Sequence, residues 1–507
     1  MSVAHNIAAT AGSRVYLTLL GLLVLPIYLR MLGPEAYGLV ALFFVLQVWF
    51  QLLDMGLTAT LAREAARCRG GAREGAELGA LLRALERLFA VVLALAAAAL
   101  CAGSGLLAES WLSLDRITPA EAARAIELMA LCIVARVLGE LYRAAIAGFE
   151  RLVWLAGCST LFGTLRLLGV LPFLAWAGAT PSNFFAYQLA VAAVETVALR
   201  VMARRYVPRA GAPSSGWGLQ PLRGVLGFSL AMSLASVVWV MASQIDKLIL
   251  SGLLTLADYG AFSLAVTAAA GVLLATGSLA DTLVPRFTTL LAQGAAQQVS
   301  RLYRQATQWT AIVAWAAAAL MACHAEHILW AWTGDAALAA QMAPVMALYA
   351  VGNAAMAVGA MPYYLQLAQG RLGLHLVGTG LMLVLLVPGL LWASARAGPT
   401  GAALVWLVVN LLYLLAWTPV AHRNFMGGQH AAWLRHDVLP AAALATACAL
   451  ATTALPWPAE RAAVALLLLP VAAAILVAAA AGSSWARDAL RQRLRATPDP
   501  GPETRTR

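Results

Sequence analysis

An apolar band of roughly 20 residues, the length that spans a bilayer as a helix, recurs almost without pause from Val15 to Ala481. Backbone amides find no water partner inside hydrocarbon, so bands of this length that are rich in Ala and Leu predict helices rather than barrel strands. The chain has 62% hydrophobic and 11% charged residues, whereas soluble domains keep about a quarter of their residues charged. We therefore expect an all-α, polytopic membrane protein.

The bands predict about fourteen spans. They lie near residues 14–32, 38–58, 84–107, 120–146, 152–178, 183–204, 223–251, 256–283, 306–332, 339–366, 372–395, 400–421, 436–455 and 461–481. Arginines collect in every second connection, and short loops rich in Lys or Arg stay on the cytoplasmic side. Both termini are therefore predicted to be cytoplasmic. The net charge of +11 follows this sidedness, which leaves little reason to expect a nucleic-acid partner.

A weak internal repeat predicts the domain organisation. When the chain is shifted by 222 positions, Tyr37 and Gly38 superpose on Tyr259 and Gly260. Chance matches from the Ala and Leu bias are the alternative, but a Tyr-Gly pair opening a span in both copies favours a parallel repeat. The predicted parts are an N-terminal six-helix lobe (1–210), a second six-helix lobe (211–430), two appended helices (431–482) and a basic cytoplasmic tail expected to be disordered (483–507). Two such lobes favour a transporter that works by alternating access.

The single lysine of the sequence, Lys247, follows Asp246 inside the seventh predicted span. A charge in mid-bilayer costs on the order of 3 kcal/mol on insertion scales, so both residues need a cavity or a partner. Either they line a central cavity, where an ammonium can hold a phosphate, or they form a neutral cap or an ion pair between the lobes. Adjacent residues point about 100° apart on a helix, so we do not expect them simply to pair with each other.

Arginines within the fourth and fifth predicted spans are further candidates for a cationic cavity. Arg136, Glu140 and Arg143 follow one another at spacings of four and three, which places them on one helical face where a local salt-bridge ladder is the alternative. Arg166 has no acidic neighbour one turn away, so it needs a partner on another helix or an anion.

Two other acids, Asp54 in the second span and Glu195 in the sixth, can bind a proton or a sodium ion, or can pair with a neighbouring arginine. With Asp246 and Glu140 they are the candidates for ion coupling. The sequence carries no motif for nucleotide binding, zinc proteolysis or a serine nucleophile. We therefore expect no catalytic residues, no bound metal and no cofactor, so that the protein is not an enzyme.

Two segments carry a family resemblance. Residues 32–67, LGPEAYGLVALFFVLQVWFQLLDMGLTATLAREAAR, resemble the start of polysaccharide biosynthesis proteins of the O-antigen flippase type. Residues 243–265, SQIDKLILSGLLTLADYGAFSLA, resemble the seventh and eighth helices of the same family. This family belongs to the multidrug/oligosaccharidyl-lipid/polysaccharide exporter superfamily.

The resemblance implies two six-helix bundles plus two C-terminal helices in the bacterial inner membrane. It also implies translocation of polyprenyl-pyrophosphate-linked oligosaccharide for O-antigen, capsule or exopolysaccharide synthesis, coupled to a proton or sodium ion, with polysaccharide polymerase machinery left open as a partner. The cationic cavity of such proteins matches Arg136, Arg143, Arg166 and Lys247 here. A lipid II flippase stays open as an alternative, while a multidrug or cation antiporter is less attractive because its site should be acidic.

Overall fold

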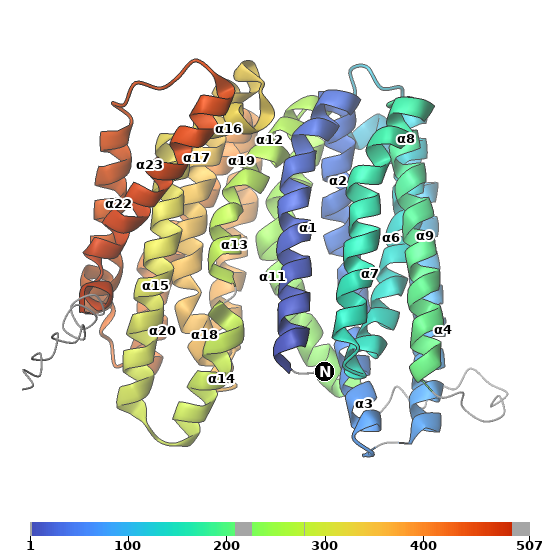
Figure 1. Ribbon diagram of the computed structural model, residues 1–507, viewed down its shortest axis with the longest axis horizontal. Coiled ribbons are helices and arrows are strands. Elements are labelled where there is room, and N and C mark those ends of the chain that lie inside the picture. The colour runs from blue at the N-terminus through green and yellow to red at the C-terminus, as the bar shows by residue number, and fades with distance from the viewer. Residues whose placement is uncertain (1–2, 73, 208–225, 278, 489–507) are drawn as a thin grey trace, which may run out of the picture. The chain divides into compact units, whose positions relative to one another are not determined.

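The computed structural model describes residues 3–72, 74–207, 226–277 and 279–488 (Figure 1). All the regular elements in these ranges are helices, which confirms the predicted all-α class. The chain divides into two compact units, Met1–Leu264 and Ala265–Arg507. The predicted lobe boundary at residues 210 and 211 lies outside the described residues and stays a prediction.

Ten helical stretches in the described ranges are long and apolar enough to cross a membrane. One of them, Gly373–Phe425, contains two helices that fold back on each other. Gly398 has a positive φ of 53° at the turn, which glycine adopts without steric cost. Across the turn, Gly389 packs against Val405, and Gly378 packs against the ring of Trp417.

Three of the predicted spans correspond to helices that are not among these ten: α6 (Pro119–Gly148), α11 (Leu226–Leu253) and α22 (Leu439–Thr452). The predicted number of about fourteen spans therefore stays a prediction.

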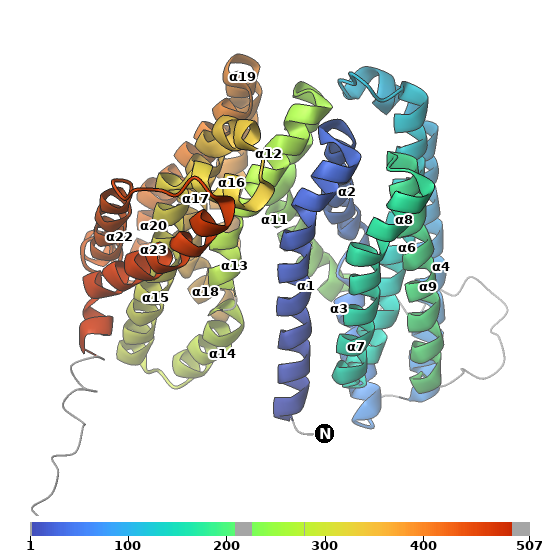
Figure 2. The ribbon, with the colours of Figure 1, turned by 45° about the horizontal axis from the view of Figure 1, so that its top comes forward.

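The first unit is a bundle of long helices, which Figures 1 and 2 show in two views. Besides α6 and α11, it contains α1 (Val3–Leu32), α2 (Pro34–Gln51), α3 (Leu57–Arg69), α4 (Gly75–Ala102), α7 (Leu152–Thr164), α8 (Val170–Ala177) and α9 (Pro181–Tyr206). Helix α6 packs along α9, and α1 packs along α7. Large apolar side chains such as Leu23 and Val194 remain exposed on the outside, as lipid-facing positions of a membrane bundle should.

Glycines allow helices of this unit to approach closely. A Cβ atom added at Gly148 of α6 would lie 2.4 Å from the carbonyl oxygen of Ala62 and 2.5 Å from the Cβ of Ala65, both in α3. Small residues at such crossings let backbones touch, which is how helices gain packing energy inside a bilayer.

A reciprocal contact supports the internal repeat. A Cβ added at Gly38 would lie 2.1 Å from the carbonyl oxygen of Leu256, and one added at Gly260 would lie 2.8 Å from that of Pro34. Leu256 begins helix α12 (Leu256–Ala269), and all four residues belong to the first unit. Both glycines and both contacted residues are related by the shift of 222 positions. Matching contacts in both directions are typical of two-fold-related copies.

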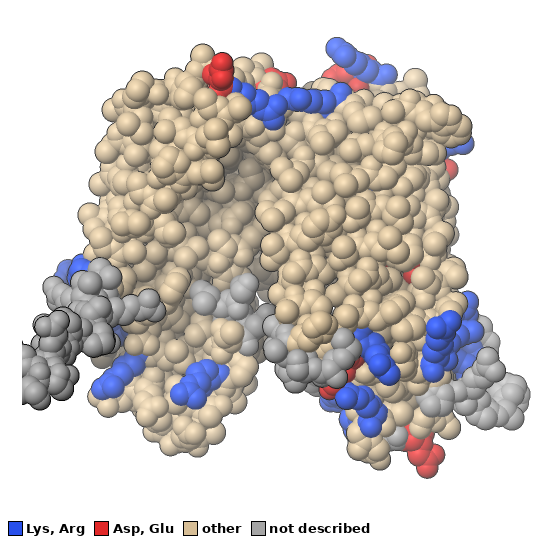
Figure 3. Space-filling model, viewed as in Figure 1, with Lys and Arg blue, Asp and Glu red and all other residues tan. Residues whose placement is uncertain are grey.

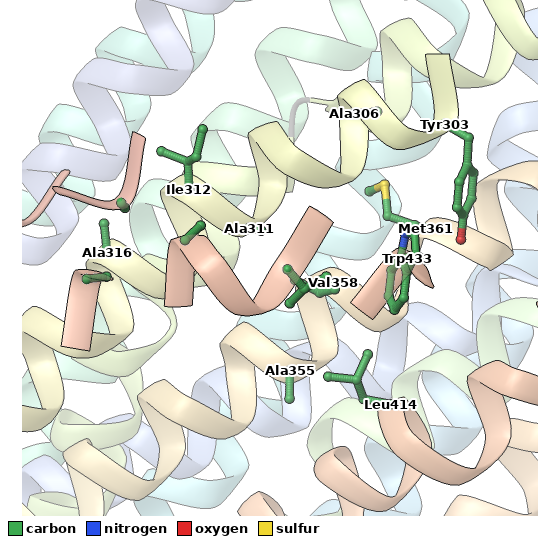
Figure 4. Close-up of a cluster of buried hydrophobic side chains, with 14 of the residues drawn as sticks. Tyr303, Ala306, Ala311, Ile312, Ala316, Ala355, Val358, Met361, Leu414 and Trp433 are labelled. Atoms are coloured by element: carbon green, nitrogen blue, oxygen red, sulfur yellow. The ribbon is translucent and has the colours of Figure 1, made fainter. Parts of the chain in front are cut away.

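The second unit is built around α15 (Ala296–Cys323), on which α22 and α23 (Arg461–Gly482) pack. Its other main helices are α13 (Gly271–Gly277), α14 (Leu279–Ala292), α16 (Ala325–Thr333), α17 (Ala336–Gly359), α18 (Met361–Ala368), α19 (Gly373–Leu412) and α20 (Thr418–Phe425). Figure 4 shows the core, in which Tyr303, Ile312, Val358, Met361 and Leu414 are buried. The two helices predicted as an appendage therefore pack directly onto this core.

Buried polar groups tie the C-terminal segment to the second unit. Asp437, which is fully buried, accepts a hydrogen bond from Arg304 Nε at 2.7 Å and one from Gln308 Nε2 at 2.6 Å. The side-chain oxygen Oε1 of Gln308 in turn accepts hydrogen bonds from Ser483 Oγ and from the backbone amide of Trp485. The first residues of the predicted tail are thus held in place, while residues 489–507, predicted to be disordered, lie outside the described part of the chain.

Charged side chains on the face seen in Figure 3 gather toward the two ends of each unit, and the middle of this face has few charged residues. This distribution is expected for helices whose central portions lie in hydrocarbon.

Candidate functional site

Charged residues from α6, α9 and a turn between α7 and α8 of the first unit meet around the buried carboxylate of Glu195. We call four residues the arginine network: Glu140 and Arg143 of α6, Glu195 of α9, and Arg166. Arg166 belongs to η3 (Leu165–Gly169), a π-helical turn between α7 and α8. Arg143 Nη2 donates to Glu195 Oε1 at 2.7 Å, and Arg166 Nη1 lies 3.6 Å from Glu195 Oε2. One carboxylate is therefore shared by two guanidinium groups.

Arg143 is held by three partners. Besides Glu195, its Nε donates to Glu140 Oε1 at 3.2 Å, and its Nη1 donates to Ser159 Oγ at 2.6 Å. The local salt bridge that the sequence left open as an alternative thus forms between Glu140 and Arg143. Three fixed donors leave this side chain little rotational freedom, so it presents its charge in a defined place.

Arg166 has a partner on another helix, which is one of the two alternatives that the sequence left open for it. This partner is Glu195. For Glu195 itself the sequence left open ion binding or pairing with a neighbouring arginine, and in the structure it pairs with arginines. The Glu195 side chain is only 6% exposed, whereas Arg143 and Arg166 are 24% and 18% exposed. The carboxylate is therefore buried behind guanidinium groups that remain partly accessible.

The π-helical turn sets the backbone around Arg166. Tyr28 Oη donates to the carbonyl oxygens of Leu167, at 2.8 Å, and of Arg166, at 3.3 Å. Gln188 Nε2 also donates to the Arg166 carbonyl at 3.1 Å. A π turn breaks the regular hydrogen-bond ladder and is frequent at functional sites. Tyr28, Gln188 and Ser159 were not predicted as site residues, although polar side chains within apolar bands are a visible signal.

Arg136 lies beside the arginine network. Its Nη1 donates to Gln47 Oε1, and its guanidinium carbon lies 5.9 Å from the centre of the Phe43 ring. It interacts electrostatically with both Arg166 and Glu195. Taken with the network, three arginines and two glutamates sum to a charge of +1, and Glu140 is the half-exposed member of this set.

The fourth predicted cation, Lys247, lies elsewhere on α11. Its Nζ donates to the carbonyl oxygen of Ser243 at 3.0 Å and lies 3.4 Å from Oδ1 of Asp246, which is fully buried. No contact joins it to the arginine network among the described residues. The expectation that Lys247 and Asp246 do not pair was wrong, because the long lysine side chain folds back along its own helix.

Asp54 has a local role. Its carboxylate accepts hydrogen bonds from the amide and the hydroxyl of Thr58, at 3.0 Å and 2.7 Å, at the start of α3. The preceding turn places Met55 and Gly56 at positive φ values of 45° and 69°. Asp54 therefore satisfies free amide donors at a helix start.

No group of three or more metal-ligating side chains is found within the described ranges.

Comparison with known proteins identifies the family. The family described as polysaccharide biosynthesis protein matches residues 3–291, more than half of the chain. A search of curated protein sequences gives no match.

Solved structures of transporters share the fold. The lipid II flippase MurJ, in an inward closed conformation, matches with a TM-score of 0.74 and 11% identity over 95% of this chain and 99% of that one. An inward-facing multidrug resistance MATE family transporter of the MOP superfamily matches with a TM-score of 0.69 and 15% identity over 83% and 96%. A MOP superfamily transporter from Pyrococcus furiosus matches with a TM-score of 0.54 and 16% identity over 85% and 95%. The chain therefore belongs to the polysaccharide biosynthesis protein family and has the fold of MOP superfamily transporters.

Proposed function

We propose that this protein moves a polyprenyl-pyrophosphate-linked oligosaccharide from the cytoplasmic to the outer leaflet of the bacterial inner membrane. The observation that carries the proposal is the arginine network of the first unit. Arg143 and Arg166, from neighbouring elements, converge on the single buried carboxylate of Glu195. Together with Arg136 they leave an excess positive charge within helices that are expected to span the membrane.

A pyrophosphate group fits this charge. An unbalanced cation in mid-membrane costs on the order of 3 kcal/mol, so it is retained where it binds an anion. Guanidinium groups present paired donors that match phosphate oxygens, and their charge does not titrate in the physiological range. In the proposed mechanism the arginines hold the pyrophosphate while the polyprenyl tail stays in lipid. Reversal of the exposed side then releases the headgroup outside for the polymerase machinery.

A proton or sodium gradient would drive the exchange. The candidate coupling residues are Asp246, Glu140, Asp54 and Glu195. Of these four, Glu140 and Glu195 are the ones that pair with arginines of the network. Asp54 is engaged at the start of α3, which makes it the weakest of the four.

Lipid II is the second candidate substrate. The match to the flippase MurJ covers 95% of this chain, against 83% for the multidrug transporter. Lipid II also carries a pyrophosphate, so the same arginines would serve both substrates. An organic cation fits less well, since the network already holds a positive excess.

The test compares three substrates in proteoliposomes that contain the full-length protein. One preparation holds a polyprenyl-pyrophosphate-linked oligosaccharide, the second holds lipid II, and the third measures uptake of a cationic dye. We expect rapid translocation of the first substrate. Translocation of lipid II alone would support the second candidate. Dye transport without movement of either lipid would overturn the proposal.

A further inference from the structure

The position of Glu195 suggests what occupies the arginines when no substrate is bound. Its two carboxylate oxygens face different guanidinium groups, Arg143 at 2.7 Å and Arg166 at 3.6 Å. The oxygens of a phosphate group likewise accept hydrogen bonds from separate donor groups. The carboxylate therefore takes the place that an anionic ligand of these arginines would take.

The two arginines are held unequally. Arg143 is fixed by Glu140, Ser159 and Glu195 together. The Arg166 side chain lies at ion-pair distance from Glu195, yet its guanidinium donates no hydrogen bond to a side chain among the described residues. A guanidinium has five N–H donors. Arg166 thus has donors left for a ligand, and its weaker contact is the one that a ligand would break first.

Resting on the proposed function, we propose that Glu195 is an internal competitor of the substrate pyrophosphate. In the empty protein it pairs with both Arg143 and Arg166. The incoming pyrophosphate, with at least twice the charge of a carboxylate, displaces it from Arg166 and then from Arg143. When the substrate leaves, Glu195 returns to the same donors. One anion is exchanged for another, so the arginines are never left without a counter-charge in the bilayer.

This exchange sets the affinity of the site. Without the competitor, two partly buried guanidinium groups would hold a pyrophosphate too tightly for rapid release. Glu195 lowers the affinity by the free energy of its own ion pairs. The tuning is useful in a transporter, because a substrate must leave the site for each cycle to finish.

The test measures binding of polyprenyl pyrophosphate without sugar to the full-length protein in nanodiscs. Glu195→Gln keeps the shape of the side chain and removes its charge. We expect this variant to bind the probe at least about tenfold more tightly, which corresponds to about 1.4 kcal/mol, and to release it more slowly.

Glu86→Gln is the matched control. Glu86 of α4 also lies between two arginines, Arg200 at 3.7 Å and Arg204 at 3.4 Å, but these are about half exposed and lie outside the arginine network. This variant should bind the probe as the wild type does. Glu195→Asp keeps the charge but shortens the side chain, and it should tighten binding by a smaller factor. It decides the question if Glu195→Gln does not fold.

Two failures are distinguishable. If the wild type binds the probe, and Arg166→Ala weakens that binding, but Glu195→Gln or Glu195→Asp leaves it unchanged or weaker, the competitor role is wrong while the proposed function stands. If the folded wild type and Glu195→Gln both fail to bind, the pyrophosphate site itself is wrong and the competitor role falls with it.

Discussion

The ion pair between Arg143 and Glu195 should contribute strongly to stability. Replacing Arg143 by Met removes the charge, keeps most of the apolar stem, and leaves Glu195 with only the longer contact to Arg166. Removing one partner of a buried pair costs about 3–5 kcal/mol. Arg143 is 24% exposed, so we expect the lower end of this range, a loss of about 3 kcal/mol in the free energy of unfolding.

Arg204→Met is the matched control for this loss. Arg204 lies 3.4 Å from Glu86 and is 53% exposed, and exposed pairs contribute about 0–1 kcal/mol. Unfolding by denaturant in mixed micelles measures both variants. The double variant Arg143→Met with Glu195→Gln should lose less than the sum of the single losses, because it leaves no unpaired carboxylate. Equal losses for Arg143→Met and Arg204→Met, or additive losses in the double variant, would refute this reasoning.

Two further predictions concern packing and pH. Gly148→Ala should lower the free energy of unfolding by about 1–3 kcal/mol, because its Cβ would overlap the carbonyl oxygen of Ala62 at 2.4 Å. Gly157→Ala in α7 is the control, since open space surrounds that position, and it should be neutral or stabilising; a similar loss in both would contradict the packing argument. Burial lowers the pKa of His430, between the last spans of the second unit, below its usual value. Below about pH 6.5 the unfolded chain therefore binds a proton that the folded chain does not. The free energy of unfolding should then decrease as the pH is lowered. Thermal unfolding from pH 8 to 5.5 should show this fall in the wild type and a smaller one in His430→Gln, whereas identical slopes would exclude the contribution of His430.

Properties that depend on local sequence were predicted correctly. The apolar bands predicted an all-α protein because the backbone groups of such bands can form all their hydrogen bonds within a helix when they lie in a bilayer. The predicted break between residues 395 and 400 coincides with the turn at Ala397 and Gly398. The contact between Glu140 and Arg143 follows from their spacing of three residues on one helix.

Contacts between segments that are far apart in the chain could not be predicted from the sequence. Arg143 and Glu195 are 52 positions apart, and only the packing of α6 on α9 brings them together. The sequence indicated that Arg166 needed a partner helix or an anion, but not that Glu195 would pair with it. The π-helical turn that carries Arg166 has no sequence signature of its own, since Tyr28 and Gln188 stabilise it from other helices. For Lys247 the simple rule of side-chain directions failed, because it ignored the length of the lysine side chain.

Transport by Arg166→Ala tests the central claim most directly. Proteoliposomes that contain the wild type, Arg166→Ala or the control Arg204→Ala are compared for translocation of a polyprenyl-pyrophosphate-linked oligosaccharide, at equal amounts of folded protein. If the arginine network binds the pyrophosphate, Arg166→Ala should translocate at least about tenfold more slowly, a loss of about 1.4 kcal/mol, while Arg204→Ala stays close to the wild type. Equal rates for all three proteins would contradict the claim.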